Sequence, residues 1–152
     1  MSFSDGGWTH RRGALGDASE KAFWEWCEGK AVRWGLDNPA PSDLHVPSIP
    51  QRVRAAPDFL TNKSFVECCG VGRPQVLKLK LEKWDALRWW HTLHPVSVFI
   101  WDSHKKRKVL IGLEDLTTLI NRPEVIEISY FDDTKLVFVI PIDAIVELGE
   151  VL

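Results

Sequence analysis

Two carboxylates, Asp58 and Glu67, stand at positions where a purely structural acid has little reason to be. Glu67 interrupts the apolar run 65–69, which has the composition of a buried strand, and Asp58 follows Pro57 at the end of the preceding segment. Antiparallel neighbours joined by a short turn can bring two such side chains to one sheet edge. Acidic oxygens held close together repel each other and lose solvation, and a hard divalent cation relieves both costs. The pair therefore indicates a site for a hard divalent cation.

Helices and strands must position these acids. A helix is expected from residue 17 or 19 to about 34, with Glu20 in its first turn, followed by a proline-rich loop over 35–50. Strands are expected over 51–56, 64–69, 76–81, 96–101 and 107–113, helices over 82–93 and 114–120, a hairpin over 124–131 and 135–140, and a final apolar segment over 142–148. This order predicts an α/β fold in one domain, 1–152, with residues 1–16 as a flexible basic arm.

The motif Pro57-Asp58, eight further residues and then Val66-Glu67-Cys68-Cys69-Gly70 resembles that of the PD-(D/E)xK nuclease superfamily. The element order over about 11–120 is similar to its Holliday-junction resolvase branch. The resemblance implies a restriction-endonuclease-like core, a central mixed sheet flanked by helices. It also implies Mg²⁺- or Mn²⁺-dependent hydrolysis of DNA, with a four-way junction as the leading substrate and another repair or recombination nuclease as the alternative.

The same resemblance assigns roles to individual residues. Glu20 matches the acid that many members carry on their first helix, and Asp58, Glu67 and the carbonyl of Cys68 would hold the metal. The superfamily lysine, however, falls on Cys69. Three lysines could replace it: Lys78 and Lys80 lie on the next expected strand, and Lys83 opens the following helix. We expect Lys80, then Lys78, to supply the ammonium that orients the attacking water. If none does, the fold would be a DNA-binding module without activity.

The net charge of −2 hides a strong segregation of charge. Residues 61–110 carry 10 Lys and Arg against 4 Asp and Glu, whereas residues 111–152 carry 2 against 9. Such segregation gives one face a positive field that attracts phosphate. The expected DNA contacts are Arg11, Arg12, Arg73, Lys105, Lys106, Arg107 and Lys108. A solvated basic hairpin turn over 104–108 explains part of the same pattern, and a protein-interaction domain with scattered surface acids stays open as an alternative.

The remaining unusual residues favour structural roles. Three cysteines, two of them adjacent, form no Cys-x-x-Cys pair, and neighbouring strand residues point to opposite faces, so buried thiols are favoured over a zinc site. Packing is also favoured over base stacking for Trp89-Trp90. The apolar strands of the C-terminal third need a cover, which a homodimer would supply. No apolar run approaches 18 residues and no secretory signal is visible, so we expect a cytoplasmic protein, in the host cytoplasm if a bacteriophage encodes it.

Overall fold

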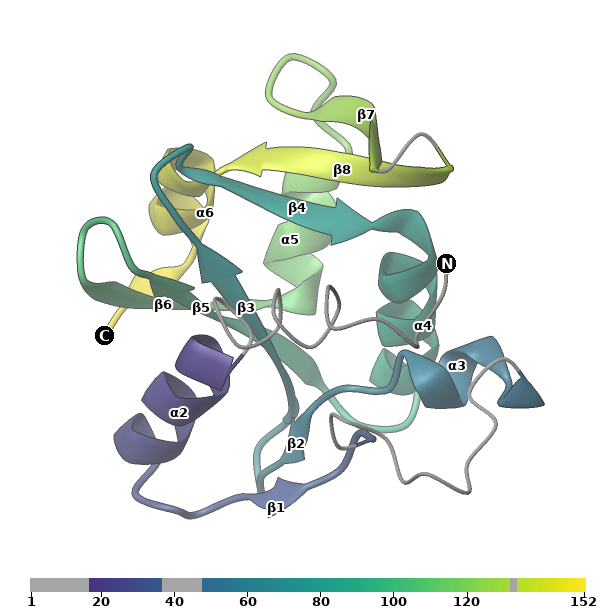
Figure 1. Ribbon diagram of the computed structural model, residues 1–152, viewed down its shortest axis with the longest axis vertical. Helices are drawn as coiled ribbons and strands as arrows, with labels where there is room; N and C mark the ends of the chain where they lie inside the picture. The colour runs from purple at the N-terminus through teal and green to yellow at the C-terminus, as the bar shows by residue number, and fades with distance from the viewer. Residues whose placement is uncertain (1–16, 37–47, 132–133) are drawn as a thin grey trace.

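The computed structural model describes residues 17–36, 48–131 and 134–152. They form a mixed six-stranded sheet and an antiparallel three-stranded sheet, with helices packed against them (Figure 1). The helices are α2 (Asp17–Trp26), α3 (Gln51–Arg54), α4 (Leu81–His91), α5 (Leu113–Ile120) and α6 (Ile142–Leu148). The strands are β1 (Val32–Arg33), β2 (Phe59–Leu60), β3 (Phe65–Val71), β4 (Val76–Lys80), β5 (Val96–Asp102), β6 (Arg107–Gly112), β7 (Glu127–Phe131), β8 (Lys135–Pro141) and β9 (Glu150–Val151). The mixed α/β class is therefore as the sequence predicts.

The larger sheet has the strand order β1-β2-β3-β5-β6-β9, in which only β3 and β5 are parallel neighbours. The smaller sheet has the order β4-β8-β7. Because β2 is two residues long, its ladder with β3 covers only Phe65 and Val66. From Glu67 onward, one edge of β3 pairs with no described strand. This edge is where the candidate site lies.

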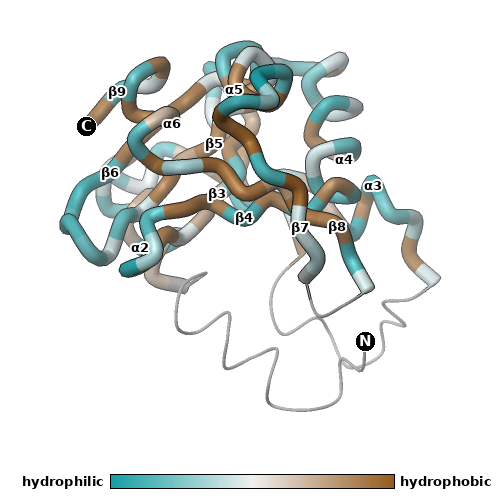
Figure 2. The backbone as a smooth tube through the Cα atoms, turned by 90° about the horizontal axis from the view of Figure 1, so that it is seen from above, coloured by the Kyte–Doolittle hydropathy of each residue, from teal (hydrophilic) through white to brown (hydrophobic). Residues whose placement is uncertain are grey.

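Strand alternation sorts the core of the larger sheet into two faces. On one face, Ala22 and Phe23 of α2 pack against the strand residues Phe59, Val66, Cys68 and Phe99 in a small cluster. On the other face, residues such as Phe65 and Val98 join the main core, to which α4, α5, α6 and the smaller sheet all contribute. Figure 2 shows the hydrophobic segments concentrated on the central strands and the hydrophilic ones on peripheral turns. The acids of interest lie where these two faces meet the free edge of β3.

Two expected elements were wrong. The first helix ends at Trp26 rather than near residue 34, because Glu28 and Gly29 adopt positive φ angles of 55° and 68° and the amide of Gly29 donates to the carbonyl of Trp24. Residues 51–56 contain the short helix α3 instead of a strand. None of its residues is buried, so it carries no periodic apolar signal that would reveal it. The other expected strands, helices and hairpin are present with shifted ends.

An expected segment cannot be compared with the structure. The arm over residues 1–16, with Arg11 and Arg12, lies outside the described residues. The helices in the described part of the chain reach 11 residues in α4, and none has the length and apolar composition needed to cross a bilayer.

Candidate active site

The three expected acids converge at the free edge of β3. Glu67 lies on β3 itself, Asp58 immediately precedes β2, and Glu20 projects from α2. The β2–β3 register places Asp58 next to Glu67, because Phe59 pairs with Val66. The negative charges of Asp58 and Glu20 both raise the pKa of Glu67, which is consistent with this proximity. Residues 47 positions apart in the sequence thus contribute to one cluster.

Glu67 is a buried carboxylate, only 6% exposed, that is held by a lysine. Both of its oxygens contact the Lys83 ammonium, with Oε1 at 2.9 Å and Oε2 at 3.0 Å from Nζ. The same ammonium donates to the carbonyls of Ala55 and Ala56, at 3.3 and 3.4 Å. Lys83 therefore joins α4, β3 and the segment that leads into Asp58.

Lys83, rather than Lys80 or Lys78, is the lysine that the structure places against Glu67. Both of the expected lysines belong to β4, which leaves the larger sheet and pairs with β8. The side chain of Lys78 is exposed there, and Lys80 lies close enough to Glu82 to lower its pKa. One helical turn further on, α4 packs over the larger sheet and carries Lys83 back to Glu67. This return of the chain cannot be read from the strand pattern.

Asp58 replaces the missing strand partner of β3. Its Oδ2 accepts a hydrogen bond of 2.8 Å from the amide of Cys68, just where the β2–β3 ladder has ended. The opposite oxygen, Oδ1, lies 3.9 Å from Nη2 of Arg33. Burial raises the pKa of Asp58, and the charge of Glu20 raises it further, against the opposing effects of Lys83 and the Cys68 amide. The Asp58 side chain is thus held at Oδ2 by the Cys68 amide, while Oδ1 lies on the side of Arg33.

Arg33 is a site residue that the sequence analysis missed. Its Nη1 lies 2.9 Å from Oε2 of Glu20, and its guanidinium lies over the Phe59 ring, 5.3 Å from the centroid. Nη2 also donates to the carbonyl of Leu36, at 3.0 Å. Because α2 ends at Trp26 and the chain turns at Gly29, Arg33 lies on β1, facing α2, instead of on a longer helix. Gly29 is the sequence signal that could have found it, as a helix stop.

The protonation of the Glu67–Lys83 pair follows from burial and charge. Burial, reinforced by the negative charge of Asp58, raises the pKa of Glu67 to about 8 despite its ion pair with Lys83. For Lys83, burial favours the neutral amine, but Glu67 and Asp58 outweigh it and the pKa is raised. Lys83 is therefore a cation at neutral pH, and the cluster holds a carboxylate that gains a proton easily.

The thiols beside these acids are neutral. Burial raises the pKa of Cys68, and so do the charges of Asp58 and Glu67; burial likewise raises the pKa of Cys69, with Glu67 the next cause. A neutral thiol is neither a nucleophile nor a good metal ligand. Cys27, the third thiol, donates to the carbonyl of Trp24 at 3.5 Å. These observations agree with structural cysteines.

The donor atoms of the cluster suit a hard cation only in part. Within the described residues, no three His, Cys, Asp or Glu side chains are grouped as ligands of one metal ion. Asp58 and Glu67 nevertheless offer adjacent carboxylate oxygens, and Mg²⁺ commonly uses one or two carboxylates and keeps several waters. Among the described residues, Arg33 contacts Glu20 and Asp58, and Lys83 contacts Glu67. Asp58 and Glu67 are therefore the members of the cluster whose donor chemistry Mg²⁺ uses, whereas Glu20 is engaged by Arg33.

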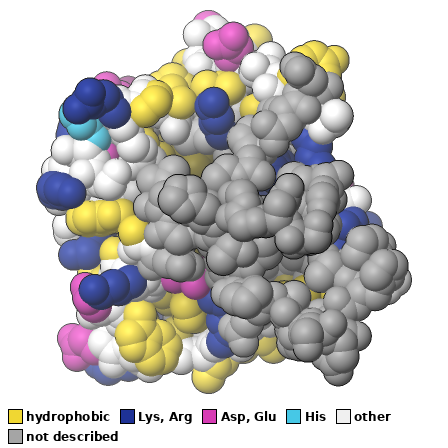
Figure 3. All heavy atoms as spheres, in the orientation of Figure 1, with side chains coloured by type: hydrophobic (Ala, Val, Ile, Leu, Met, Phe, Trp, Pro, Cys, Tyr) yellow, Lys and Arg dark blue, Asp and Glu magenta, His cyan; other side chains and the backbone are white. Residues whose placement is uncertain are grey.

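Those of the expected phosphate-binding residues that the structure describes lie at the end of the sheet where parallel β3 and β5 finish. Lys105 and Lys106 are exposed in the β5–β6 turn, and Arg73 is exposed in the β3–β4 turn. Figure 3 shows Lys and Arg side chains along the side of the molecule that carries the β5–β6 turn. This end is four residues from Glu67 along β3, roughly 13 Å. Lys108 is the second residue of β6 and is half-buried.

Arg107 differs from its basic neighbours because it stabilises the turn. Its Nε donates to Oδ2 of the fully buried Asp102 at 3.0 Å, and its Nη2 lies 3.6 Å from Asp143. Asp102 also accepts from the amides of His104 and Lys105 and from Gln75. Burial favours the protonated form of Asp102, but these hydrogen bonds outweigh it and lower its pKa. Arg107 is thus held in the fold rather than displayed to solvent.

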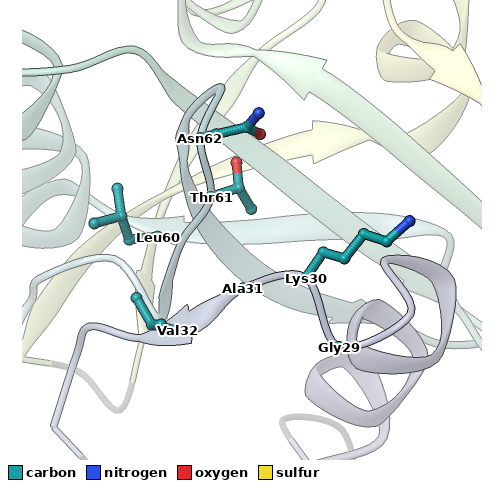
Figure 4. A pocket seen from close by; sticks show the side chains of 7 residues that line it. All are labelled: Gly29, Lys30, Ala31, Val32, Leu60, Thr61 and Asn62. Carbon is teal, nitrogen blue, oxygen red and sulfur yellow. The ribbon is translucent and has the colours of Figure 1, made fainter.

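A shallow groove lies at the β1–β2 edge of the larger sheet (Figure 4). Val32 and Leu60, which pair across the two strands, line it together with the turns that follow α2 and β2. Val32 precedes Arg33 and so points to the opposite face of β1. The groove holds no acidic side chain.

Comparison with known proteins adds no family to this geometry: no family model matches the chain, and neither does a curated protein or a solved structure.

Proposed function

We propose that the protein is a metal-dependent endonuclease that hydrolyses phosphodiester bonds in DNA. The observation that carries the proposal is the convergence of Glu20, Asp58 and Glu67, from three separate elements, with the Lys83 ammonium among them. The likeness of the motif from Pro57 to Gly70 to PD-(D/E)xK nucleases supports the same chemistry and a restriction-endonuclease-like core. Lys83 takes the part of the lysine that is absent at position 69.

In this proposal each side chain has a separate task. Asp58 and Glu67 would hold Mg²⁺ or Mn²⁺, which when bound would lower the pKa of water and stabilise charge on the phosphate. The Lys83 ammonium orients the attacking water and offsets the negative charge that develops on the phosphate. Because its pKa is raised, Lys83 acts as a cation and a hydrogen-bond donor, not as a base. Arg33 holds Glu20 at the border of the cluster, from which it would contribute through a water.

The substrate proposed first is a four-way DNA junction, and this preference rests on the resemblance to the resolvase branch. A homodimer would give two sites for a substrate with two-fold symmetry. Ile128, Tyr130 and Leu136 offer an apolar surface for a second copy, since they are 59%, 68% and 41% exposed and Tyr130 pairs with Leu136 across β7 and β8. A protein that stays monomeric by light scattering over the micromolar range would remove the dimer.

The test is cleavage of a labelled four-way junction and of a matched linear duplex, each with Mg²⁺ and with EDTA. We expect the wild type to cut with Mg²⁺ alone, and Glu67→Ala to stop cutting while binding is largely kept. Preference for the junction would support resolution, and equal cutting of the duplex would favour another repair or recombination nuclease. Cutting by Glu67→Ala at the wild-type rate would overturn the site.

A non-catalytic DNA-binding module is the second candidate, and one observation favours it. Both oxygens of Glu67 are engaged by Lys83, so a metal must share or displace this contact. Binding of DNA with no cutting under any divalent cation would select this candidate.

A further inference from the structure

A solvent-exposed indole stands directly beside the acid cluster. Trp34 follows Arg33, and its amide donates a 2.9 Å hydrogen bond to the carbonyl of Asp58. Its side chain faces away from that of Arg33, as alternation along the chain requires. The residue is 43% exposed, although one side of its ring contacts Phe65 at a centroid distance of 5.2 Å. An apolar ring is thus presented to solvent next to a charged site.

The Trp34 ring is supported by other rings and is held in place. Trp90 meets it edge-on at 5.7 Å and meets Phe65 at 5.5 Å, and Trp89 lies edge-on against Trp90 at 5.1 Å. Trp34, Phe65, Trp89 and Trp90 thus form an aromatic wall. The indole N–H of Trp90 donates to the carbonyl of Arg52 at 2.9 Å, which ties this wall to α3. A ring fixed in advance loses little entropy when a ligand stacks on it.

Positive charge borders the aromatic wall. Arg52 and Arg54 are exposed on α3, which has no acidic residue, and the Arg52 guanidinium lies over the Trp89 ring at 5.1 Å. Gln51 anchors α3 by donating to the carbonyl of Glu82 at the start of α4. Glu82 itself is paired with Lys135 at 2.7 Å, which offsets its negative charge. A fixed ring beside exposed guanidinium groups matches the alternation of base and phosphate in a nucleic-acid strand.

We propose that Trp34 stacks on an unpaired base of the substrate, while Arg52 and Arg54 contact the phosphates beside it. This inference rests on the proposed function, because it places that base next to the phosphate at Asp58 and Glu67. In a continuous duplex, base faces are covered by their neighbours, so only an unpaired or frayed base can use the ring. Trp34 thereby selects DNA in which a base is unpaired or frayed.

The test is binding in EDTA of a labelled single strand and of a blunt duplex, measured by fluorescence anisotropy. We expect Trp34→Leu to weaken single-strand binding about tenfold, the effect of losing one stacked base, and to leave duplex binding within about twofold. Trp34→Phe should restore most of the affinity. Trp24→Leu is the matched control, because Trp24 is 46% exposed on α2 and should leave both affinities unchanged. Equal weakening by the control, or none by Trp34→Leu, overturns the inference.

A second measurement uses the unaltered protein and so does not depend on how a variant folds. A single strand carrying 5-iodouracil should crosslink on irradiation to the peptide that contains Trp34, and crosslinks confined to α2 would contradict the proposal. The two levels of failure are distinguishable. A wild type that neither binds nor cuts DNA removes the proposed function together with this inference, whereas a wild type that cuts DNA with no role for Trp34 removes the inference alone.

Discussion

Glu67 and Lys83 form an ion pair in which one ammonium contacts both carboxylate oxygens, at 2.9 and 3.0 Å, across the interface between β3 and α4. The same ammonium donates to the carbonyls of Ala55 and Ala56, in the segment that enters Asp58. One side chain therefore positions two of the three acids, both by charge and by backbone contacts.

Replacing Lys83 by methionine keeps an unbranched side chain, one heavy atom shorter, and removes its charge. We expect cleavage to fall about 10²–10³-fold, the range seen when a donor to the transition state is lost. Stability should fall by about 2–3 kcal/mol, because Glu67 would be left buried without its partner. Denaturant unfolding and initial cleavage rates measure the two effects. Lys78→Met, at an exposed position on β4, is the control, and a Lys83→Met protein as active as this control would exclude Lys83 from the chemistry.

The pKa of Glu67 predicts how stability depends on pH. In the folded protein this pKa is raised to about 8, against 4.5 for an ordinary glutamate. Between these values the folded chain holds a proton that the unfolded chain releases, so stability falls as pH rises. This contribution is fully present below pH 4.5 and is lost by about pH 8. Glu67→Gln should remove it, so that its Tm should gain on that of the wild type from pH 5 to 8. A constant Tm difference over this range would contradict the prediction.

Arg33 competes with any cation that approaches Glu20 and Asp58. Replacing it by glutamine should free Glu20 from its 2.9 Å ion pair and make the cluster more negative. We expect Mg²⁺ or Mn²⁺ to bind roughly three- to tenfold more tightly, a difference that calorimetric titration can resolve. Arg73→Gln removes the same charge from an exposed turn at the end of β3 and should change little. Weaker metal binding by Arg33→Gln would mean that Arg33 supports the metal site.

Gly35 offers a test of backbone positioning that alters no charge. A Cβ at this position would lie 2.8 Å from the carbonyl oxygen of Pro57 and 3.4 Å from Cα of Asp58. Gly35→Ala should therefore displace Asp58 and reduce cleavage by about tenfold or more, the scale of a misplaced catalytic group. At Gly112 a Cβ would meet nothing within 4 Å, so Gly112→Ala should behave like the wild type. Equal activity of the two variants would show that the Asp58 backbone tolerates the shift.

Local pattern was enough to predict most elements of the fold. Strands β5 and β6 and the β7–β8 hairpin are apolar, of ordinary length and bounded by polar turns. Each can therefore be recognised from the local sequence pattern. The short helix α3 does not, because all four of its residues are solvent-exposed or nearly so and none is buried. The division of the strands into two sheets depends on how β4 crosses to β8, which no local pattern contains.

The candidate site was predictable in its acids and not in its cations. Glu67 was found because a carboxylate within an apolar strand is costly and needs a reason. Lys83 sits in the first turn of a helix, where a lysine looks like any surface residue, and only the packing of α4 on β3 gives it a partner. Arg33 was not predicted because the expected first helix extended to about residue 34, whereas α2 ends at Trp26.

The central claim is that Glu67 takes part in metal-dependent cleavage of DNA. Its most direct test is the initial cleavage rate of purified wild type and Glu67→Gln on one junction substrate with Mg²⁺, both proteins being shown to be folded by thermal unfolding. We expect a fall of about 10³-fold or more for Glu67→Gln, and no cutting by either protein in EDTA. Wild-type rates in the variant, or cutting that persists in EDTA, would contradict a metal-dependent centre at Glu67.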